Sequence, residues 1–474
     1  MVSFSPLDII IILLYFASVV IIGFRSLRRE KTSADEYLLA SRQLTLPMFV
    51  ATLVSTWYGG ILGVGEYSYR FGISNWIVFG VPYYFFAMIF AFALAKKARA
   101  ANLVSIPDKL YQSYDTKTSL LGAVLTFFLI SPAPYVLMLG VLVQLVFSFN
   151  LTLSVVLSTV LTICYLYTGG FRSDVYTNIF EFVLMFTGFG LIVPFAYLKF
   201  GGMEFLNHNL PPLHLTWHGG NSLQFILVWF FIAMWTLVDP AFYQRCYAAK
   251  DGATAKKGIL LSILFWLVFD FCTSTAGLYA RAALPNLQQP VFAYPMLAEV
   301  TLPSFAKGIF YVGMLATIMS SLSSLTFIGA VTIGNDVVGR LLVYEKEEVR
   351  AEAIKLWTKI GLLVTGAAAI ALALWIPSVV KLWYVIGTSI IPGLLVPLMA
   401  SFFPRVSIPA RHAFASMFFG WLTSTVWLAF GQLQGGNYWL SIEPMYPGLC
   451  ISLLAWAVGR RALKTHSGRF GQSR

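Results

Sequence analysis

Apolar stretches long enough to cross a lipid bilayer recur along the whole chain, and no other feature of the sequence constrains its fold as strongly. A bilayer core about 30 Å thick takes roughly 20 apolar residues as a helix. Of the 474 residues, 58% are hydrophobic and only 11% are charged, whereas a soluble chain of this length needs far more polar surface. The sequence therefore predicts an all-α polytopic membrane protein. We expect about thirteen spans, near residues 7–25, 47–68, 74–95, 118–148, 151–168, 175–198, 223–244, 258–280, 304–334, 357–376, 379–403, 412–431 and 445–459.

The placement of lysine and arginine predicts the orientation of these spans. Basic residues gather in the cytoplasmic segments of membrane proteins. If the N-terminus is outside and the number of spans is odd, almost all of the 32 basic residues fall in inner segments or in the short C-terminal tail. Topology thus explains the net charge of +12, and no nucleic-acid partner is expected. The basic residues that fall in outer segments are Arg70, Lys199, Arg281, Lys307 and Lys381.

Two of the predicted spans carry signs of an interrupted helix. The span at 47–68 contains Gly59–Gly60 near its middle, and the span at 223–244 contains Asp239–Pro240 after an apolar run. Interrupted segments at corresponding places in two halves of a chain indicate an inverted-repeat transporter. Glycine is also common in membrane helices as a packing residue. This pattern alone leaves both interpretations open.

The run "TIMSSLSSLT", residues 317–326, concentrates hydroxyl groups inside a predicted span. Thr317, Ser320 and Ser321 share one face of a helix, because residues three and four apart are neighbours. Together with carbonyls freed by an unwound partner helix, these hydroxyls could form a cage of hard oxygen ligands for sodium. The alternative is that small hydroxylated residues let helices pack closely and hydrogen-bond across their interface.

Several motifs in order along the chain resemble those of the solute:sodium symporters, which have a ten-helix inverted-repeat fold of the LeuT type. The matching stretches are "DEYLLASRQLTLPMFVATLVSTWYGG", "LVSIPDKLYQSYDTKT", "TGGFRSDVYTNIFEFVLMFTG", "DPAFYQRCYAAKDGATAKKG" and "LATIMSSLSSLTFIGAVTIGNDVV". The resemblance covers nearly the whole chain. It implies three parts: an extra N-terminal span in 1–30 with its N-terminus outside, a transport core in 45–403 with discontinuous first and sixth helices, and two C-terminal spans with a short basic cytoplasmic tail in 404–474.

The resemblance also implies a sodium site between the first and eighth core helices. Ser320 and Ser321 would contribute side-chain hydroxyls, whereas Ser55, Tyr58 and Thr317 would contribute mainly backbone carbonyls. Thr56 and Gly59 are alternatives if the alignment around Ser55 slips by one residue. Na⁺ is therefore the expected ion.

Some members of the family hold a second sodium with further serines of the eighth core helix and an aspartate of the fifth. Here Ser323 and Ser324 match, together with Ser320, but Asn178 stands in the place of the aspartate. Losing that negative charge weakens a cation site, so we expect one sodium per cycle. Glu181, one turn further on, could replace the aspartate only if the helix rotates.

The expected lining of the solute site comes from the discontinuous helices and their neighbours. An acid inside a membrane, such as Asp239, indicates function, although its place before Pro240 also suits a helix cap. Asp270 lies within a span and needs a polar partner. "STWYGG" also looks like the choline-transporting branch, so Trp57 and Trp235 could form a cation–π cage for a quaternary ammonium. The candidate residues are Trp57, Leu62, Glu66, Tyr83, Tyr84, Trp229, Trp235 and Asp239.

The expected function is sodium-coupled import of a small polar organic solute across the cell membrane by alternating access. A non-enzyme is expected, because transport makes and breaks no bond. One alternative is a proton-coupled transporter that uses Glu181, Asp239 or Asp270. A channel or a membrane-embedded sensor is a further alternative. For the solute, an amino acid, a monocarboxylate, a sugar and a quaternary ammonium such as choline all stay open.

Overall fold

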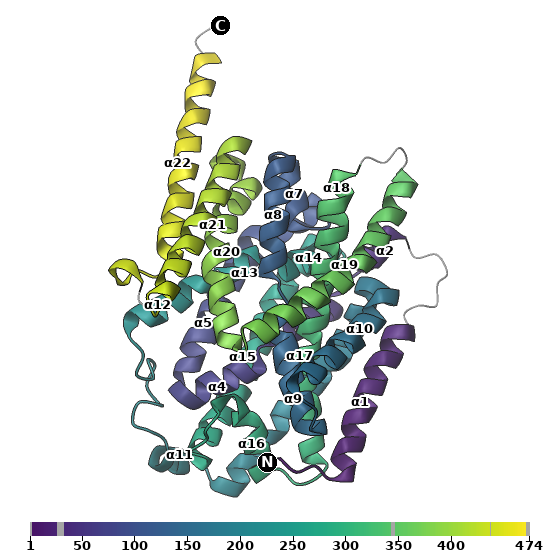
Figure 1. Ribbon diagram of the computed structural model, residues 1–474, viewed down its shortest axis with the longest axis vertical. Helices are drawn as coiled ribbons and strands as arrows, with labels where there is room; N and C mark the ends of the chain where they lie inside the picture. The colour runs from purple at the N-terminus through teal and green to yellow at the C-terminus, as the bar shows by residue number, and fades with distance from the viewer. Residues whose placement is uncertain (1, 26–32, 343–346, 437, 471–474) are drawn as a thin grey trace.

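The protein is a bundle of helices with no β-strand in the part of the chain that is described (Figure 1). The computed structural model describes residues 2–25, 33–342, 347–436 and 438–470. Residues 26–30 of the predicted N-terminal segment and 471–474 of the predicted tail lie outside these ranges. The first half contains α1 (Pro6–Arg25), α2 (Ala34–Leu39), α3 (Leu46–Trp57), α4 (Ile61–Phe71), α5 (Val81–Ile89), α6 (Ala95–Ala101), α7 (Ile106–Ser113), α8 (Thr116–Leu129), α9 (Ala133–Phe147), α10 (Leu151–Phe200) and α11 (Met203–Asn209).

The second half continues the bundle, and α22 ends at the opposite end of the long axis from the start of α1 (Figure 1). Short π-helical segments, η2 (Trp76–Gly80), η3 (Phe90–Leu94) and η5 (Thr332–Val338), link several helices. The remaining helices are α12 (Leu223–Ile232), α13 (Trp235–Val238), α14 (Pro240–Ala248), α15 (Gly252–Ala283), α16 (Ala293–Thr301), α17 (Ala306–Val331), α18 (Gly339–Leu341), α19 (Glu347–Trp375), α20 (Val379–Phe402), α21 (Ala410–Leu433) and α22 (Met445–Phe470).

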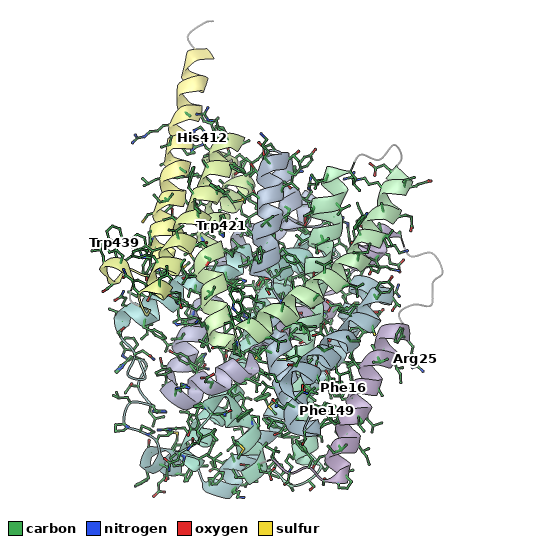
Figure 2. All side chains as sticks on the ribbon, in the orientation of Figure 1. Phe16, Arg25, Phe149, His412, Trp421 and Trp439 are labelled. Atoms are coloured by element: carbon green, nitrogen blue, oxygen red, sulfur yellow. The ribbon has the colours of Figure 1, made fainter. Side chains whose placement is uncertain are left out.

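The outer surface of the bundle is that of a membrane protein. Side chains project all round it (Figure 2), and many of the exposed ones are large and apolar, such as Leu14, Phe92, Val160, Leu264 and Leu363. In water such a surface would aggregate, whereas lipid tails solvate it. The prediction of a polytopic membrane protein is confirmed.

The number of spans is not settled by length and composition. Among the described residues, ten helices are long and apolar enough to cross a membrane, and counting the bent pair α3–α4 as a further span raises the number to eleven. This count treats α10 as one span and leaves out α22. Thirteen therefore stays a prediction.

The spans predicted at 151–168 and 175–198 are joined by a kink. The helix α10 covers all 50 residues from Leu151 to Phe200, but its backbone leaves the helical conformation at Gly170, so two helices meet there. At 1.5 Å per residue a straight helix of this length would measure roughly 75 Å, far more than a bilayer. Gly170 bends it, because its backbone (φ 57°, ψ −145°) is one that only glycine adopts readily. The direction of the chain thus changes at a kink rather than in a loop.

Both interrupted helices are confirmed. The helices α3 and α4 are bent by 58° at Tyr58–Gly60. The span that follows Ser222 is broken twice, between α12 and α13 and again at Asp239, where α14 begins. The glycines allow close approach at the first break: a Cβ at Gly59 would clash with Ser321, and a Cβ at Gly60 would clash with Trp383.

The helix α17 lies at the centre of the bundle. It packs against α10, α1, α3, α9 and α19, and every residue from Phe310 to Val331 is buried. The hydroxyl-rich run at 317–326 therefore faces protein on all sides and no lipid. Its polar groups must find partners on the neighbouring helices, because an unpaired polar group in such surroundings is costly.

Candidate functional site

The hydroxyls of Ser320 and Ser321 meet the broken end of α3. Ser320 Oγ donates to the carbonyl of Ser55 at 2.9 Å and to that of Thr317 at 3.0 Å. Ser321 Oγ donates to the carbonyl of Thr56. The last carbonyls of a helix have no partner within it, so the end of α3 presents free oxygens to α17. Four of the predicted ligands, Ser55, Thr317, Ser320 and Ser321, are thus brought together.

The side chains of Thr317 and Tyr58 turn away from this cluster. Thr317 Oγ1 donates to the carbonyl of Gly313 at 2.6 Å within its own helix. The Tyr58 hydroxyl bonds to Asp270 and to Thr273 of α15. A cation at Ser320 could therefore meet these two residues only through their backbone carbonyls, as the resemblance implied.

Hydroxyl and carbonyl oxygens at the junction of α3 and α17 suit a hard cation of low charge. Each hydroxyl keeps lone pairs when its hydrogen points elsewhere, and each carbonyl has two lone pairs. All of these residues are buried, so the site is shielded from bulk water. Among the described residues, no group of His, Cys, Asp and Glu side chains forms a site for a transition metal. The neutral oxygen cluster fits sodium.

A second polar cluster lies one turn further along α17. Ser323 Oγ donates to Asp174 Oδ1 at 2.8 Å, and Ser324 Oγ lies 2.8 Å from Asp174 Oδ2. Asn178 Nδ2 donates to Ser324 Oγ at 3.0 Å. The three predicted residues Asn178, Ser323 and Ser324 are brought together, but they surround an aspartate that the sequence analysis did not identify.

Arg245 completes this second cluster. It lies on α14 with no exposed surface, and its Nη2 is 3.3 Å from Asp174 Oδ2 and 2.7 Å from Ser324 Oγ. Neither Asp174 nor Arg245 was predicted. A sequence signal existed for the first: Asp174 precedes Asn178 by four residues and so shares its helical face.

A cavity of about 120 Å³ opens beside the break of α3 and is walled mainly by aromatic rings. The ring of Trp57 is part of this wall, and its centroid lies 5.4 Å from that of Tyr83 and 5.9 Å from that of Trp266. None of the described residues that line the cavity is basic. The polar and aromatic lining residues are Thr56, Trp57, Tyr58, Phe79, Tyr83, Tyr84, Ser131, Tyr135, Trp229, Trp235, Asp239, Trp266, Asp270 and Trp383.

Two carboxylates lie in this aromatic wall. Asp270 accepts hydrogen bonds from the hydroxyls of Tyr58 and Tyr84, which supply the polar partners that the sequence left unnamed. Asp239 accepts a hydrogen bond from the N–H of Ala241 at 2.6 Å and so caps α14. Asp239 therefore fulfils both of its predicted roles in position, as a helix cap and as a residue of the cavity wall.

The structure places two of the candidate residues elsewhere. Leu62 is fully buried but is not a lining residue of the cavity, and Glu66 forms a salt bridge with Arg70 at 3.0 Å on α4. Both lie on α4 two residues from Val64, which does line the cavity, and residues two apart on a helix do not share a face. The lining residues that sequence reasoning missed include Tyr135, Trp266 and Trp383. Nothing in the local sequence marked the last of these, whose ring lies against Gly60 and Gly63 in the structure.

Searches among solved structures and curated proteins find transporters along nearly the full length of the chain. The structure of a Na⁺-coupled sialic acid symporter in a substrate-bound outward-open state superposes with a TM-score of 0.79 at 16% identity, covering 96% of this chain and 98% of that one. A transporter of the nucleobase-cation-symport-1 family in a closed conformation gives a TM-score of 0.61 at 14% identity, covering 93% and 96%. These likenesses establish the LeuT-type fold.

The curated relatives agree with the fold. The sodium/pantothenate symporter of Escherichia coli is 26% identical and covers 96% of both chains. The sodium/proline symporter of Staphylococcus aureus is 23% identical and covers 96% of this chain and 92% of its own. The high-affinity choline transporter 1 of Drosophila melanogaster is 22% identical over 93% of this chain and 73% of its own. The model of the Sodium:solute symporter family matches residues 37–420. The chain therefore belongs to the sodium:solute symporter family, and its function is sodium-coupled secondary transport.

Proposed function

We propose that this protein imports a small organic cation together with sodium, and that it is a transporter with no enzymatic step. Sodium binds where α17 meets the end of α3, with the hydroxyls of Ser320 and Ser321 and the carbonyls of Ser55, Tyr58 and Thr317 as ligands. The solute binds in the adjoining aromatic cavity. We place the N-terminus outside the membrane and the C-terminus in the cytoplasm, as the distribution of the basic residues indicates.

The observation that supports an organic cation is the chemistry of the cavity wall. Tryptophan and tyrosine faces attract cations, by about 2 kcal/mol or more where water is excluded. Asp239 and Asp270 add negative charge, and no basic residue among the described lining residues offsets it. An anionic solute would have to bind at the N-terminus of α4, which begins after Gly60 in the cavity wall without a side-chain cap, because Asp239 already caps the N-terminus of α14.

Coupling follows from the short segment that the two sites share. The carbonyls of Ser55 and Thr56 face α17, whereas the next residue, Trp57, stands in the cavity. Sodium that draws the carbonyls of this segment toward α17 therefore also fixes the position of the Trp57 ring. Sodium and solute therefore favour the same conformational state of the protein, and each raises the affinity for the other by the same factor.

Proton coupling is less well supported by the contacts of the buried acids. Glu181 accepts a hydrogen bond from Tyr15 at 3.0 Å and lies outside the cavity wall, whereas Asp239 and Asp270 are engaged by a helix N-terminus and by two tyrosines.

A thermal-shift screen of the purified protein tests the proposed function. Choline, betaine, proline, pantothenate and glucose are each added in sodium chloride, in potassium chloride, and at acid and neutral pH. We expect choline to raise the melting temperature most, and to do so only with sodium. Stabilisation by an anionic or neutral solute, with choline inactive, would contradict the organic cation. Stabilisation that ignores sodium and follows pH would favour proton coupling.

A further inference from the structure

The side chain of Arg245 lies where four helices of the transport core meet. It projects from α14, the second half of the twice-broken span, and none of its surface is exposed. Its Nη2 donates to Thr56 Oγ1 on α3 at 2.8 Å and to Ser324 Oγ on α17 at 2.7 Å, and it pairs with Asp174 on α10 at 3.3 Å. Its Nη1 donates to Gln244 Oε1 at 2.9 Å. The two terminal nitrogens of the guanidinium are thus held by oxygens from α3, α10, α14 and α17.

One of these oxygens, the hydroxyl of Ser324, belongs to the second sodium site that the resemblance implied. The hydroxyl of Ser324 donates to the carboxylate of Asp174, and its lone pairs face two donors, Arg245 Nη2 and Asn178 Nδ2. A hydroxyl has one hydrogen and two acceptor positions, so Ser324 has no free lone pair for a metal ion. Thr56 Oγ1 likewise faces both of these donors.

Within the cluster, the negative charge of Asp174 and the positive charge of Arg245 offset each other, while Asn178, Ser323 and Ser324 are neutral. The nearby carboxyl groups of Glu181 and Asp239 lie outside the cluster and bond to Tyr15 and to the N-terminus of α14. A sodium ion added here would bring a net positive charge into a buried site, where like charges repel strongly because little solvent screens them. An arginine side chain stays protonated in proteins and cannot leave the site by diffusion.

We propose that the guanidinium of Arg245 fills the place of a second cation, so that the chain binds one sodium ion. This inference rests on the sodium site proposed at Ser320 and Ser321 and sets its stoichiometry. It assigns to Arg245 the role of a tethered cation that joins α14 to α3, α10 and α17. Asn178 stands where some members of the family carry an aspartate. In this chain the negative charge belongs to Asp174, one helical turn earlier, where it pairs with Arg245.

Counting bound sodium tests this inference. Purified full-length protein is equilibrated with ²²Na⁺, and the ions bound at saturation are counted per chain. We expect one ion for the wild type and none for the double variant Ser320→Ala with Ser321→Ala at the same concentration. Two ions for the wild type would overturn the tethered cation and leave the proposed sodium site standing. No bound ion would overturn both.

Variants of the ion pair make the test sharper. Arg245→Gln leaves Asp174 buried without its partner, so a sodium ion should bind there and the count should rise to two. Arg245→Lys keeps a tethered positive charge and should stay at one. The double variant Asp174→Asn with Arg245→Gln removes both charges and should also stay at one. A count of one in folded Arg245→Gln protein would contradict the inference. If that variant does not fold, the wild-type count decides.

Discussion

Ser321→Ala is expected to raise the sodium concentration that half-stabilises the purified protein by about 10- to 100-fold, since a bond to a charged partner contributes about 1.5–3 kcal/mol and each 1.4 kcal/mol is tenfold. The substitution removes one oxygen beside the carbonyl of Thr56 and leaves the packing volume nearly unchanged. Ser320→Ala should have a similar effect, because Ser320 Oγ lies at 2.9 Å from the Ser55 carbonyl. The double variant should lose its response to sodium.

The measurement is thermal unfolding over a series of sodium concentrations, with potassium chloride keeping the ionic strength constant. Thr326→Val is the matched control. It removes a buried hydroxyl from the same helix, but that hydroxyl donates only to the carbonyl of Leu322 in α17 itself. The control should keep the wild-type sodium response. Wild-type responses in both serine variants would remove the basis of the proposed sodium site.

Asp270→Asn is expected to weaken choline binding by about 10- to 100-fold, because it removes one of the two negative charges in a poorly solvated wall. The size of the residue is unchanged. An amide can accept a hydrogen bond from one of the two tyrosines, Tyr58 and Tyr84, and donate to the other. The fold should therefore survive, and the sodium response measured without solute should remain.

Choline titrations that follow tryptophan fluorescence report this effect directly, since five tryptophans line the cavity. Glu181→Gln is the matched control. It neutralises a buried carboxylate that bonds to Tyr15 on α1 and does not line the cavity. Its choline affinity should equal that of the wild type. Equal losses in both variants, or no loss in Asp270→Asn, would contradict the role of Asp270 in binding a cation.

The parts of the fold that depend on local chemistry could be predicted from the sequence. Gly59–Gly60 and Asp239–Pro240 correctly marked the two interrupted helices, because glycine and proline act on the backbone where they stand. The division between the spans at 151–168 and 175–198 has a related cause. Hydropathy falls there, and Gly170 kinks the backbone, so two helices meet without a loop between them.

The cavity was predicted where its residues come from the interrupted helices and from α5. Trp57, Tyr83, Tyr84, Trp235 and Asp239 all line it. Leu62 and Glu66 do not, whereas Val64 between them does, because residues two apart on α4 lie on different faces of the helix. Which face of α4 meets the cavity depends on packing against other helices and is not written in the local sequence.

Contacts between distant segments could not be predicted from one sequence. Arg245 pairs with Asp174 across 71 positions of the chain, and Tyr58 meets Asp270 across 212. Trp383 lines the cavity from α20, far along the chain from Trp57. No short motif encodes such partners, since they depend on how the helices pack.

The most direct test of the account is an electron cryomicroscopy map of the protein in sodium chloride, compared with a map in N-methylglucamine chloride. The account predicts a density peak between the hydroxyls of Ser320 and Ser321 and the carbonyls at the end of α3, present only with sodium. An unbroken helix through residues 58–60, or a sodium-dependent peak beside Asp174 with none at Ser320 and Ser321, would contradict it.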